Sequence, residues 1–246
     1  MTSPSPAIAE RWRVGAHSLL GARRGTNMDA FVLLPAEGIV VLADGMGSTR
    51  RGGEAARWAV QQFAEELAAT PVRDESAVNA TVAAVQQRLV AEFAVQGALT
   101  GATTLCAVVA DGDDLLIVNL GDSRCHLLHD GGLLAVTTDH TVAAHLVAVG
   151  AAEPDSPLAR RTANHLRRYL GNPAGATADV TRHRLAATDA VLLSTDGVHG
   201  VLTVDQMTDI MLADDDPELT ARRLVVAAVA AGGTDDATAL VLRPVG

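Results

Sequence analysis

The stretch Ile39–Ser48 reads IVVLADGMGS, and it joins a run of five apolar residues to a carboxylate and a glycine, Asp44 and Gly45. A second stretch, Ala190–Gly200, reads AVLLSTDGVHG and ends its apolar run in the same way. Strands that are apolar on successive residues are covered on both faces. An aspartate leaving such a strand costs free energy unless a partner compensates its charge. The two stretches therefore predict a polar site at the end of a covered sheet.

Short strand-like runs bounded by Gly, Asp and Pro follow one another along the chain instead of alternating with helices. This order favours antiparallel pairing. Longer segments with apolar residues three or four apart predict helices between the runs. We therefore expect an α+β fold, a four-layer α-β-β-α sandwich of two stacked antiparallel sheets flanked by helices. The strands are expected at Arg13–Leu20, Ala30–Leu34, Ile39–Leu42, Thr103–Val109, Leu115–Leu120, Arg124–Leu128, Leu133–Thr137, Val180–Leu185, Ala190–Ser194 and Ala237–Leu242. The helices are expected at Gly53–Ala69, Ser76–Val95, Val142–Val149, Val204–Leu212 and Pro217–Ala231, the last of them capped by Asp216.

The composition limits the class of protein. The chain has 246 residues and a net charge of −10, which argues against non-specific nucleic-acid binding. It has no apolar run long enough to span a membrane and no signal-peptide pattern at its start. We expect a cytoplasmic protein with no nucleic-acid or membrane partner, made of a loose tail over residues 1–10 and a single domain over residues 11–246. Cys106 and Cys125 are expected to be reduced, buried thiols.

Four Asp-Gly pairs occur in the chain, and they fall into two kinds. Asp111 and Asp130 lie in short polar links between strands, where Asp-Gly is typical of a hairpin turn. Asp44 and Asp196 instead leave apolar strands and lead into helices. A turn alone explains this second pair poorly.

More acidic residues stand at strand ends: Asp29, Asp122, and the neighbours Asp235 and Asp236. A set of oxygen donors favours a hard cation such as Mg²⁺ or Mn²⁺. The eight histidines show no spacing typical of zinc sites. The chain also lacks a dinucleotide-binding glycine motif, a phosphate-binding P-loop and a serine-hydrolase nucleophile elbow.

Eight short motifs occur in an order that resembles the metal-dependent Ser/Thr protein phosphatases of type 2C, the PPM family, in their short bacterial form. The resemblance extends from about Arg13 to Leu242, and the family fold is the same sandwich that the strand order favours. The motifs are RGTNMD, LADGMGSTRRGGEAA, GATTLCAVV, VNLGDSRCHLL, TTDHTVAAHLVAVG, RYLGN, LLSTDGV and GGTDDATAL.

The resemblance implies a centre of two Mn²⁺ or Mg²⁺ ions. Asp44 corresponds to the bridging ligand, and the Gly45 carbonyl to a ligand of one ion. Asp196 and Asp235 correspond to ligands of the other ion. In this family two neighbouring cations activate a shared water that attacks phosphorus directly.

Further positions complete the site that the resemblance implies. Asp29 corresponds to an outer-shell residue that contacts metal-bound water. Asp122 corresponds to the residue that holds a third ion together with Asp196. Arg24 corresponds to the phosphate-binding arginine, and Arg23 is the alternative to it. A guanidinium offers a fork to two phosphate oxygens.

The chain departs from the family pattern at several places. Met28 stands where an acidic residue or glutamine is frequent, and Met46 where animal members have the histidine proposed as general acid, so the general acid is unassigned. Asp236 replaces the usual Asn. The segment of about residues 150–168 corresponds to the mobile flap, and its arginines either attract acidic substrate segments or form a solvated face. These arginines are Arg160, Arg161, Arg167 and Arg168.

The resulting functional hypothesis is a phosphoprotein phosphatase that acts on phosphoserine and phosphothreonine and opposes a bacterial Ser/Thr kinase. Its partners would be that kinase and the kinase's phosphorylated substrates. Two alternatives stay open: a phosphatase of the same fold in sigma-factor partner switching, and a catalytically weak pseudophosphatase that acts as a binding module. Retention of Asp44, Asp196, Asp235 and Arg24 argues against the binding module. His140 and His199, near the motifs, are expected to be structural.

Overall fold

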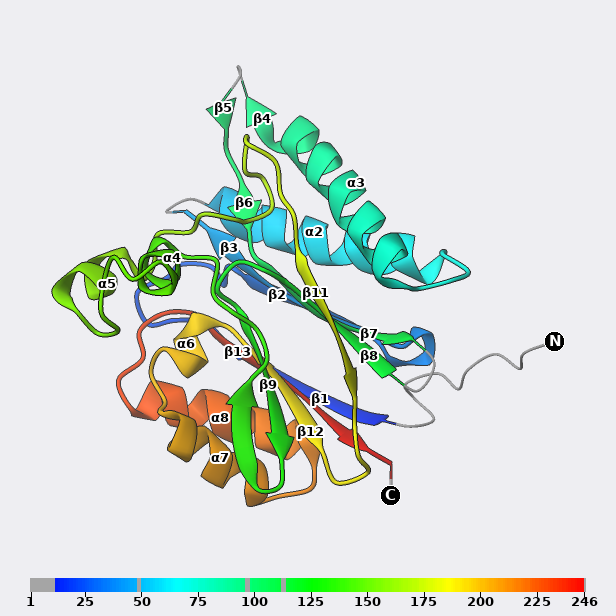
Figure 1. Cartoon of the computed structure of the whole chain (residues 1–246), viewed down its shortest axis with the longest axis vertical. Helices are drawn as coiled ribbons and strands as arrows, with labels where there is room; N and C mark the ends of the chain where they lie inside the picture. Colours follow the sequence, from blue (N-terminus) through cyan, green and yellow to red (C-terminus); the bar gives the residue numbers. More distant parts are fainter. Residues whose placement is uncertain (1–11, 48–49, 96–97, 112–113, 246) are drawn as a thin grey trace.

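Two antiparallel sheets lie face to face, and helices cover their outer surfaces (Figure 1). The computed structural model describes residues 12–47, 50–95, 98–111 and 114–245. The predicted tail, residues 1–10, lies outside the described residues. The predicted α+β sandwich is confirmed.

The first sheet has the strand order β11-β8-β7-β3-β2, with β6 also pairing with β3. Its strands are β2 (Asp29–Leu34), β3 (Ile39–Met46), β6 (Ala102–Thr103), β7 (Leu105–Asp111), β8 (Asp114–Leu120) and β11 (Asp179–Arg184). The second sheet has the order β1-β13-β12-β9-β10. Its strands are β1 (Trp12–Leu19), β9 (Arg124–His129), β10 (Gly132–Ala135), β12 (Ala190–Ser194) and β13 (Ala237–Pro244). A separate hairpin pairs β4 (Ala94–Val95) with β5 (Ala98–Leu99).

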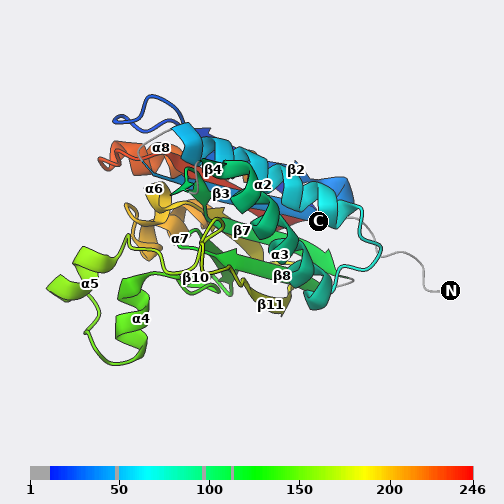
Figure 2. The same ribbon diagram turned by 90° about the horizontal axis from the view of Figure 1, so that it is seen from above.

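Helices α2 (Arg50–Ala68) and α3 (Glu75–Phe93) cover the first sheet, and α7 (Val204–Leu212) and α8 (Pro217–Ala230) cover the second (Figure 1). Helices α4 (Val142–Ala148) and α5 (Pro157–Thr162) project from one side of the sandwich (Figure 2). The remaining short elements are the 3₁₀ helix η1 (Pro35–Glu37) and helix α6 (Asp196–His199). Within the described residues, none of the helices has the length and apolar character needed to cross a membrane.

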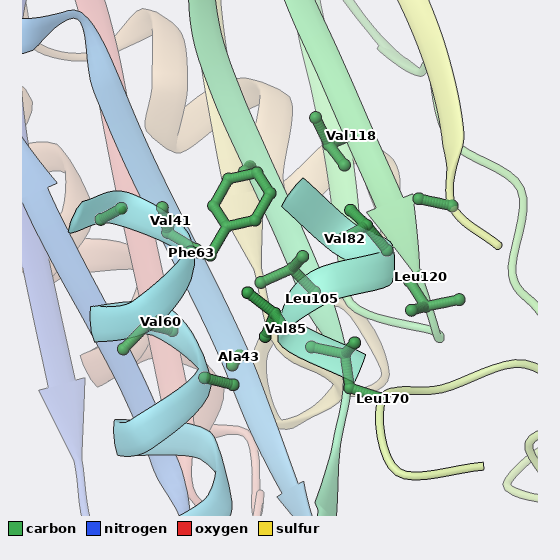
Figure 3. Close-up of a cluster of buried hydrophobic side chains, with 14 of the residues drawn as sticks. Val41, Ala43, Val60, Phe63, Val82, Val85, Leu105, Val118, Leu120 and Leu170 are labelled. Atoms are coloured by element: carbon green, nitrogen blue, oxygen red, sulfur yellow. The ribbon is translucent and has the colours of Figure 1, made fainter. Parts of the chain in front are cut away.

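Three separate apolar clusters explain the four layers. One lies between α2, α3 and the first sheet, where Phe63 inserts among Val41, Val85 and Leu105 (Figure 3). A second lies between α7, α8 and the second sheet. The third fills the space between the two sheets. Strands at the centre of both sheets are therefore covered on both faces, as the continuous apolar runs predicted.

The predicted strands occur with small shifts, and the end of β3 shows why one shift matters. β3 continues past Leu42 to Met46, because Gly45 pairs with Thr103 of β6. The predicted strand Thr103–Val109 is interrupted at Thr104. There the Thr104 Oγ1 hydroxyl accepts the Asp44 N–H at 2.8 Å, so a side chain replaces the usual backbone partner.

Helix α2 begins at Arg50, three residues before the predicted start, and includes two glycines in its first turn. A Cβ at Gly52 would lie 2.3 Å from the Met46 carbonyl oxygen. The helix therefore approaches β3 so closely that a side chain at Gly52 would clash with the strand. Helix propensity disfavours glycine inside a helix, and this explains why the start predicted from the sequence lies later than the observed one.

The Asp-Gly turns are confirmed in the described residues. Asp130 and Gly131 have φ values of 49° and 78° and join β9 to β10. Asp111 pairs with Asp114 across the β7–β8 hairpin, while Gly112 lies outside the described residues. Asp216 caps α8, as predicted, by accepting the N–H groups of Glu218 and Leu219.

Several short elements of the fold differ from those predicted. Helices α5 and α6 were not predicted, because six and four residues carry too little periodic signal. The helix predicted to end at Val95 ends at Phe93, since Ala94 is already extended and begins the β4–β5 hairpin.

Truncation of Phe63 tests the first cluster. Phe63 is fully buried, so Phe63→Ala should lower the free energy of unfolding by about 3–5 kcal/mol through lost burial and a residual cavity. Urea unfolding measures the change. Val229→Ala, in an exposed position of α8, is the control and should change the free energy little. A Phe63→Ala value as small as the control's would contradict this packing.

Candidate active site

The ends of strands from both sheets meet at one edge of the sandwich. In the first sheet Asp29 and Asp44 are direct neighbours across β2 and β3. In the second sheet Asp196 lies two residues after the end of β12, and Asp235 lies two residues before β13, the antiparallel partner of β12. Asp122 lies between β8 of the first sheet and β9 of the second. The topology thus places the five aspartates at the same edge of the sandwich, each at or near the end of a strand.

Electrostatics shows that these carboxylates are close to one another. Burial raises the pKa of Asp44 well above its usual range, and repulsion from Asp29, Asp196, Asp122 and Asp235 raises it further. The other four aspartates predicted from the sequence therefore lie close enough to Asp44 to raise its pKa.

Asp29 is buried, and its two carboxylate oxygens differ in their hydrogen bonding. Its Oδ2 accepts hydrogen bonds from the hydroxyls of Thr238 at 2.6 Å and Thr195 at 2.9 Å. Its Oδ1 is buried without a hydrogen-bond partner. Burial raises the pKa of Asp29 to about 7 in spite of the two hydroxyls. A buried carboxylate oxygen with no partner points to a group that the protein itself does not supply.

Asp122, between the two sheets, and Asp196, after β12, interact with each other. Burial, followed by repulsion from Asp196, raises the pKa of Asp122 to about 7. Burial and then repulsion from Asp235 raise the pKa of Asp196. The nearby Arg124 forms a two-point ion pair with Asp139, at 2.8 and 2.7 Å. This cation is therefore already paired and leaves the cluster only partly neutralised.

Gly45 stands where two backbone segments approach each other. A Cβ at this position would lie 2.4 Å from the Gly52 carbonyl oxygen, so no other residue fits without a shift. The Gly45 N–H donates to the Met28 carbonyl at 3.1 Å. The glycine after Asp44 is thus required by packing, whether or not its carbonyl binds a cation.

Arg24 points into the cluster and Arg23 does not. Arg24 Nε and Nη2 donate to the two oxygens of Asp235 at 2.9 and 3.1 Å. Arg24 Nη1 also donates to the Gly47 carbonyl at 3.4 Å. Arg23 is exposed to solvent. Of the two arginines, Arg24 is the one placed beside the carboxylates.

Two of the positions that depart from the family pattern, Met28 and Asp236, are buried, whereas Met46 is half-buried. Met28 is buried beside the glycines that begin α2. Asp236 is also buried and accepts two backbone N–H groups, so its charge does not lie free beside Asp235. His140 accepts the Gly121 N–H through Nδ1, and His199 Nδ1 hydrogen-bonds the Ser194 hydroxyl. Both histidines have the structural role expected of them.

The segment predicted as a flap lies at the base of α4 and along α5. Arg168 pairs with Asp179 at 2.7 Å, whereas Arg160, Arg161 and Arg167 are exposed. A cavity of about 270 Å³ lies at this base, and Arg167, Arg168, residues 138–141, Ala144, His145 and Ala148 line it. The residues that line this cavity do not include the five clustered aspartates.

The donor set fits a hard divalent cation. The clustered side chains supply only oxygen, four of them are disfavoured as free anions, and one buried oxygen has no partner. Within the described ranges, however, no three His, Cys, Asp or Glu side chains already have the geometry of a metal centre. A cation at Asp235 would have to displace the fork that Arg24 makes with it.

The raised pKa values predict how the protein responds to pH in chelator. A carboxylate with a folded pKa near 7 and an ordinary pKa of 3.8 stabilises the fold at low pH, and this contribution is lost as pH rises toward 7. Each such group changes stability by up to about 1.4 kcal/mol per pH unit.

Asp122→Asn removes one of these groups. Between pH 5 and 7 in chelator, its melting temperature should fall less than that of the wild type, by roughly 3–5 °C per pH unit. Thermal melts at several pH values measure this. Asp209→Asn changes an exposed aspartate of α7 and should follow the wild type. Parallel falls of Asp122→Asn and the wild type would contradict the raised pKa.

Comparison with known proteins now identifies the family. Residues 24–230 match the family described as protein phosphatase 2C. The serine/threonine phosphatase Stp of Listeria welshimeri is 28% identical over 210 residues, which cover 83% of each chain. The serine/threonine protein phosphatase PstP of Mycobacterium tuberculosis is 30% identical over 232 residues. These residues are 93% of this chain and 44% of PstP, so the chain spans less than half of that relative.

Solved structures agree with these relatives. The catalytic domain of PstP in complex with two manganese ions has a TM-score of 0.84 and 28% identity, covering 96% of this chain and 99% of that one. The phosphatase Stp1 of Staphylococcus aureus has a TM-score of 0.87 at 19% identity and covers both chains fully, which shows a shared fold. With a family match over most of its length and this fold, the chain belongs to the protein phosphatase 2C family.

Proposed function

We propose that this chain hydrolyses phosphoserine and phosphothreonine in proteins with the help of Mn²⁺ or Mg²⁺ held at the shared edge of the two sheets. Membership of the protein phosphatase 2C family makes it a phosphoprotein phosphatase. The observation that carries the proposal is a group of four aspartates that all raise the pKa of Asp44, with the Arg24 fork beside them. Such a cluster suits cations on one side and a phosphate on the other.

The carboxylates divide into ligands and supporting residues. Asp44, the Gly45 carbonyl, Asp196 and Asp235 would hold two ions, and Asp122 a third together with Asp196. The bound cations supply an activated water nucleophile and neutralise charge on the phosphate. Asp44 lies at the centre of this arrangement because all the other clustered carboxylates repel it.

Asp29 is suited to orient water. Its Oδ2 is held by two threonine hydroxyls, which fix the side chain, and its Oδ1 is left without a protein donor. A water molecule beside the cations would satisfy that oxygen. This supports the outer-shell role of Asp29.

Arg24 binds the substrate phosphate in this proposal. A guanidinium donates two parallel hydrogen bonds to two phosphate oxygens and stabilises charge that develops in the transition state. Arg24 already makes such a fork, with the two oxygens of Asp235. A cation at Asp235 would release the guanidinium for phosphate, so ion binding and phosphate binding would be linked.

We further propose that the substrates are proteins phosphorylated by a Ser/Thr kinase in the cytoplasm. The family assignment supports a phosphorylated protein as substrate. The free, buried state of Cys106 and Cys125 agrees with a reducing compartment. A kinase from the same source supplies the test, because its phosphorylated products should be dephosphorylated by this chain.

Metal dependence tests the proposed centre. Hydrolysis of a phosphothreonine peptide should require Mn²⁺ or Mg²⁺ and stop in chelator. Asp44→Asn keeps the size of the side chain and removes its charge, so kcat should fall at least about a hundredfold. A cation that binds only the folded state at a hundred times its Kd adds about 2.7 kcal/mol, which raises the melting temperature by roughly 5–10 °C.

The melting shift separates binding from catalysis. Asp44→Asn and Asp235→Asn should lose most of the Mn²⁺ shift, while Asp130→Asn, in the β9–β10 turn, should keep it. An equal shift in the wild type and Asp44→Asn would refute the assigned centre. A full shift without hydrolysis of any phosphopeptide would instead favour a binding module.

Arg24 can be tested against its neighbour. Arg24→Ala should lower kcat/KM for the phosphopeptide and weaken inhibition by inorganic phosphate, because the fork is lost. Arg24→Lys should restore only part of the lost kcat/KM, since an ammonium cannot make the two-point contact. Arg24→Ala should also bind Mn²⁺ at a lower concentration, because Asp235 loses its internal cation. Steady-state kinetics and Mn²⁺ titration measure these effects, and a loss in Arg23→Ala alone would mean that Arg23 is the phosphate ligand.

A further inference from the structure

The buried carboxylate of Asp236 binds two backbone N–H groups from a segment that is distant in sequence. Its Oδ1 accepts the N–H of Gly21 at 2.8 Å, and its Oδ2 accepts the N–H of Met28 at 2.7 Å. The residue is 3% exposed. Gly21 and Met28 are the two ends of the loop that carries Arg24. We call residues 21–28 the arginine loop.

Other contacts also support the arginine loop, among them the Gly45 N–H, which donates to the Met28 carbonyl at 3.1 Å. Inside it, the Arg24 N–H donates to the Gly21 carbonyl and makes a turn at 3.0 Å. Asn27 donates to the Ser18 hydroxyl at 2.8 Å and accepts the Asp29 N–H at 2.9 Å. These contacts shape the loop locally. The carboxylate of Asp236 joins both of its ends to the start of β13.

The same short segment holds the partner of Arg24. Asp235 precedes Asp236 directly and carries the Arg24 fork. Gly21 packs on this segment so closely that a Cβ there would lie 2.4 Å from the Asp235 carbonyl carbon. Residues 235 and 236 therefore fix both the loop that carries the guanidinium and the guanidinium itself.

A carboxylate is the side chain that this junction requires. Two converging N–H donors need two acceptor oxygens, which an ionised aspartate supplies and an asparagine does not. Hydrogen bonds from backbone N–H groups to a charged acceptor are stronger than those to a neutral one. Truncation would leave two N–H groups in a buried place without partners.

We propose that Asp236 is a positioning residue, whose carboxylate closes the arginine loop at Gly21 and Met28 and thereby places Arg24 to receive the substrate phosphate. The proposal rests on the proposed function through the role of Arg24. Asp236 acts through the loop and does not touch the substrate. It differs in this from the neighbouring Asp235, whose proposed role is to hold a cation.

The test measures the affinity of inorganic phosphate for the Mn²⁺-loaded full chain by calorimetry. Asp236→Ala should raise the Kd at least about tenfold, because a binding group displaced by about 1 Å can lose up to about a hundredfold. Asp236→Asn keeps one acceptor and should fall between Asp236→Ala and the wild type. It also serves if Asp236→Ala does not fold. The Mn²⁺ melting shift should persist in both variants.

The decisive comparison repeats both substitutions in an Arg24→Ala background. There they should leave the phosphate Kd unchanged, because the arginine they position is absent. The same loss in both backgrounds would overturn the proposal. If Arg24→Ala weakens phosphate binding and neither Asp236 variant does, the positioning role fails while the proposed function stands. If Arg24→Ala itself has no effect, Arg24 is not the phosphate ligand and both assignments fail.

A matched control separates positioning from stability. Asp189 is also 3% exposed and accepts the backbone N–H of Ala186 at 2.8 Å, but it lies at the opposite end of β12 from Asp196. Asp189→Asn should lower the melting temperature without changing phosphate affinity. An equal loss of phosphate affinity in Asp189→Asn and Asp236→Asn would show a general effect of instability and overturn the proposal.

Discussion

Mutual repulsion among grouped carboxylates, of which Asp29 is buried and the other four are half-buried, is the constraint on which the rest of this structure depends. Burial and four neighbouring carboxylates all disfavour the charged form of Asp44. Charges in such a place must be neutralised, paired or matched by a cation. The apolar clusters on either side of both sheets hold the strand ends in register, so the aspartates cannot separate to relieve the repulsion. The stability of the sandwich thus maintains a site that is unfavourable on its own.

The protein relieves only part of this repulsion with its own groups. Arg24 neutralises Asp235, and the hydroxyls of Thr195 and Thr238 satisfy one oxygen of Asp29. Arg124 is already paired with Asp139. What is left over is negative charge and an oxygen without a partner. A divalent cation would supply what is missing, so the same electrostatics that strain the fold would also favour cation binding.

Each of the two sheets supplies part of the proposed site. The first sheet supplies Asp44 and Asp29 from neighbouring strands, and the second supplies Asp196 and Asp235 from the junction of β12 and β13. Any change that shifts one sheet against the other would separate these pairs. The third apolar cluster, between the sheets, therefore influences the site although none of its residues lies in it. Arg24 depends on a third segment, the arginine loop, which hydrogen bonds attach to the start of β13.

The sequence by itself determined the sandwich, the hairpin turns and the group of aspartates at strand ends, because burial leaves a periodic pattern and Asp-Gly has a defined turn geometry. Only the tertiary structure decided how those side chains are partnered. Asp29 and Thr238 are 209 residues apart, and Asp236 and Gly21 are 215 apart, so no local pattern records either contact. From the sequence, Asp236 is interpreted as one more negative charge beside Asp235. In the fold its two oxygens each accept a backbone N–H, because a hydrogen bond depends on which donors the completed packing brings within reach.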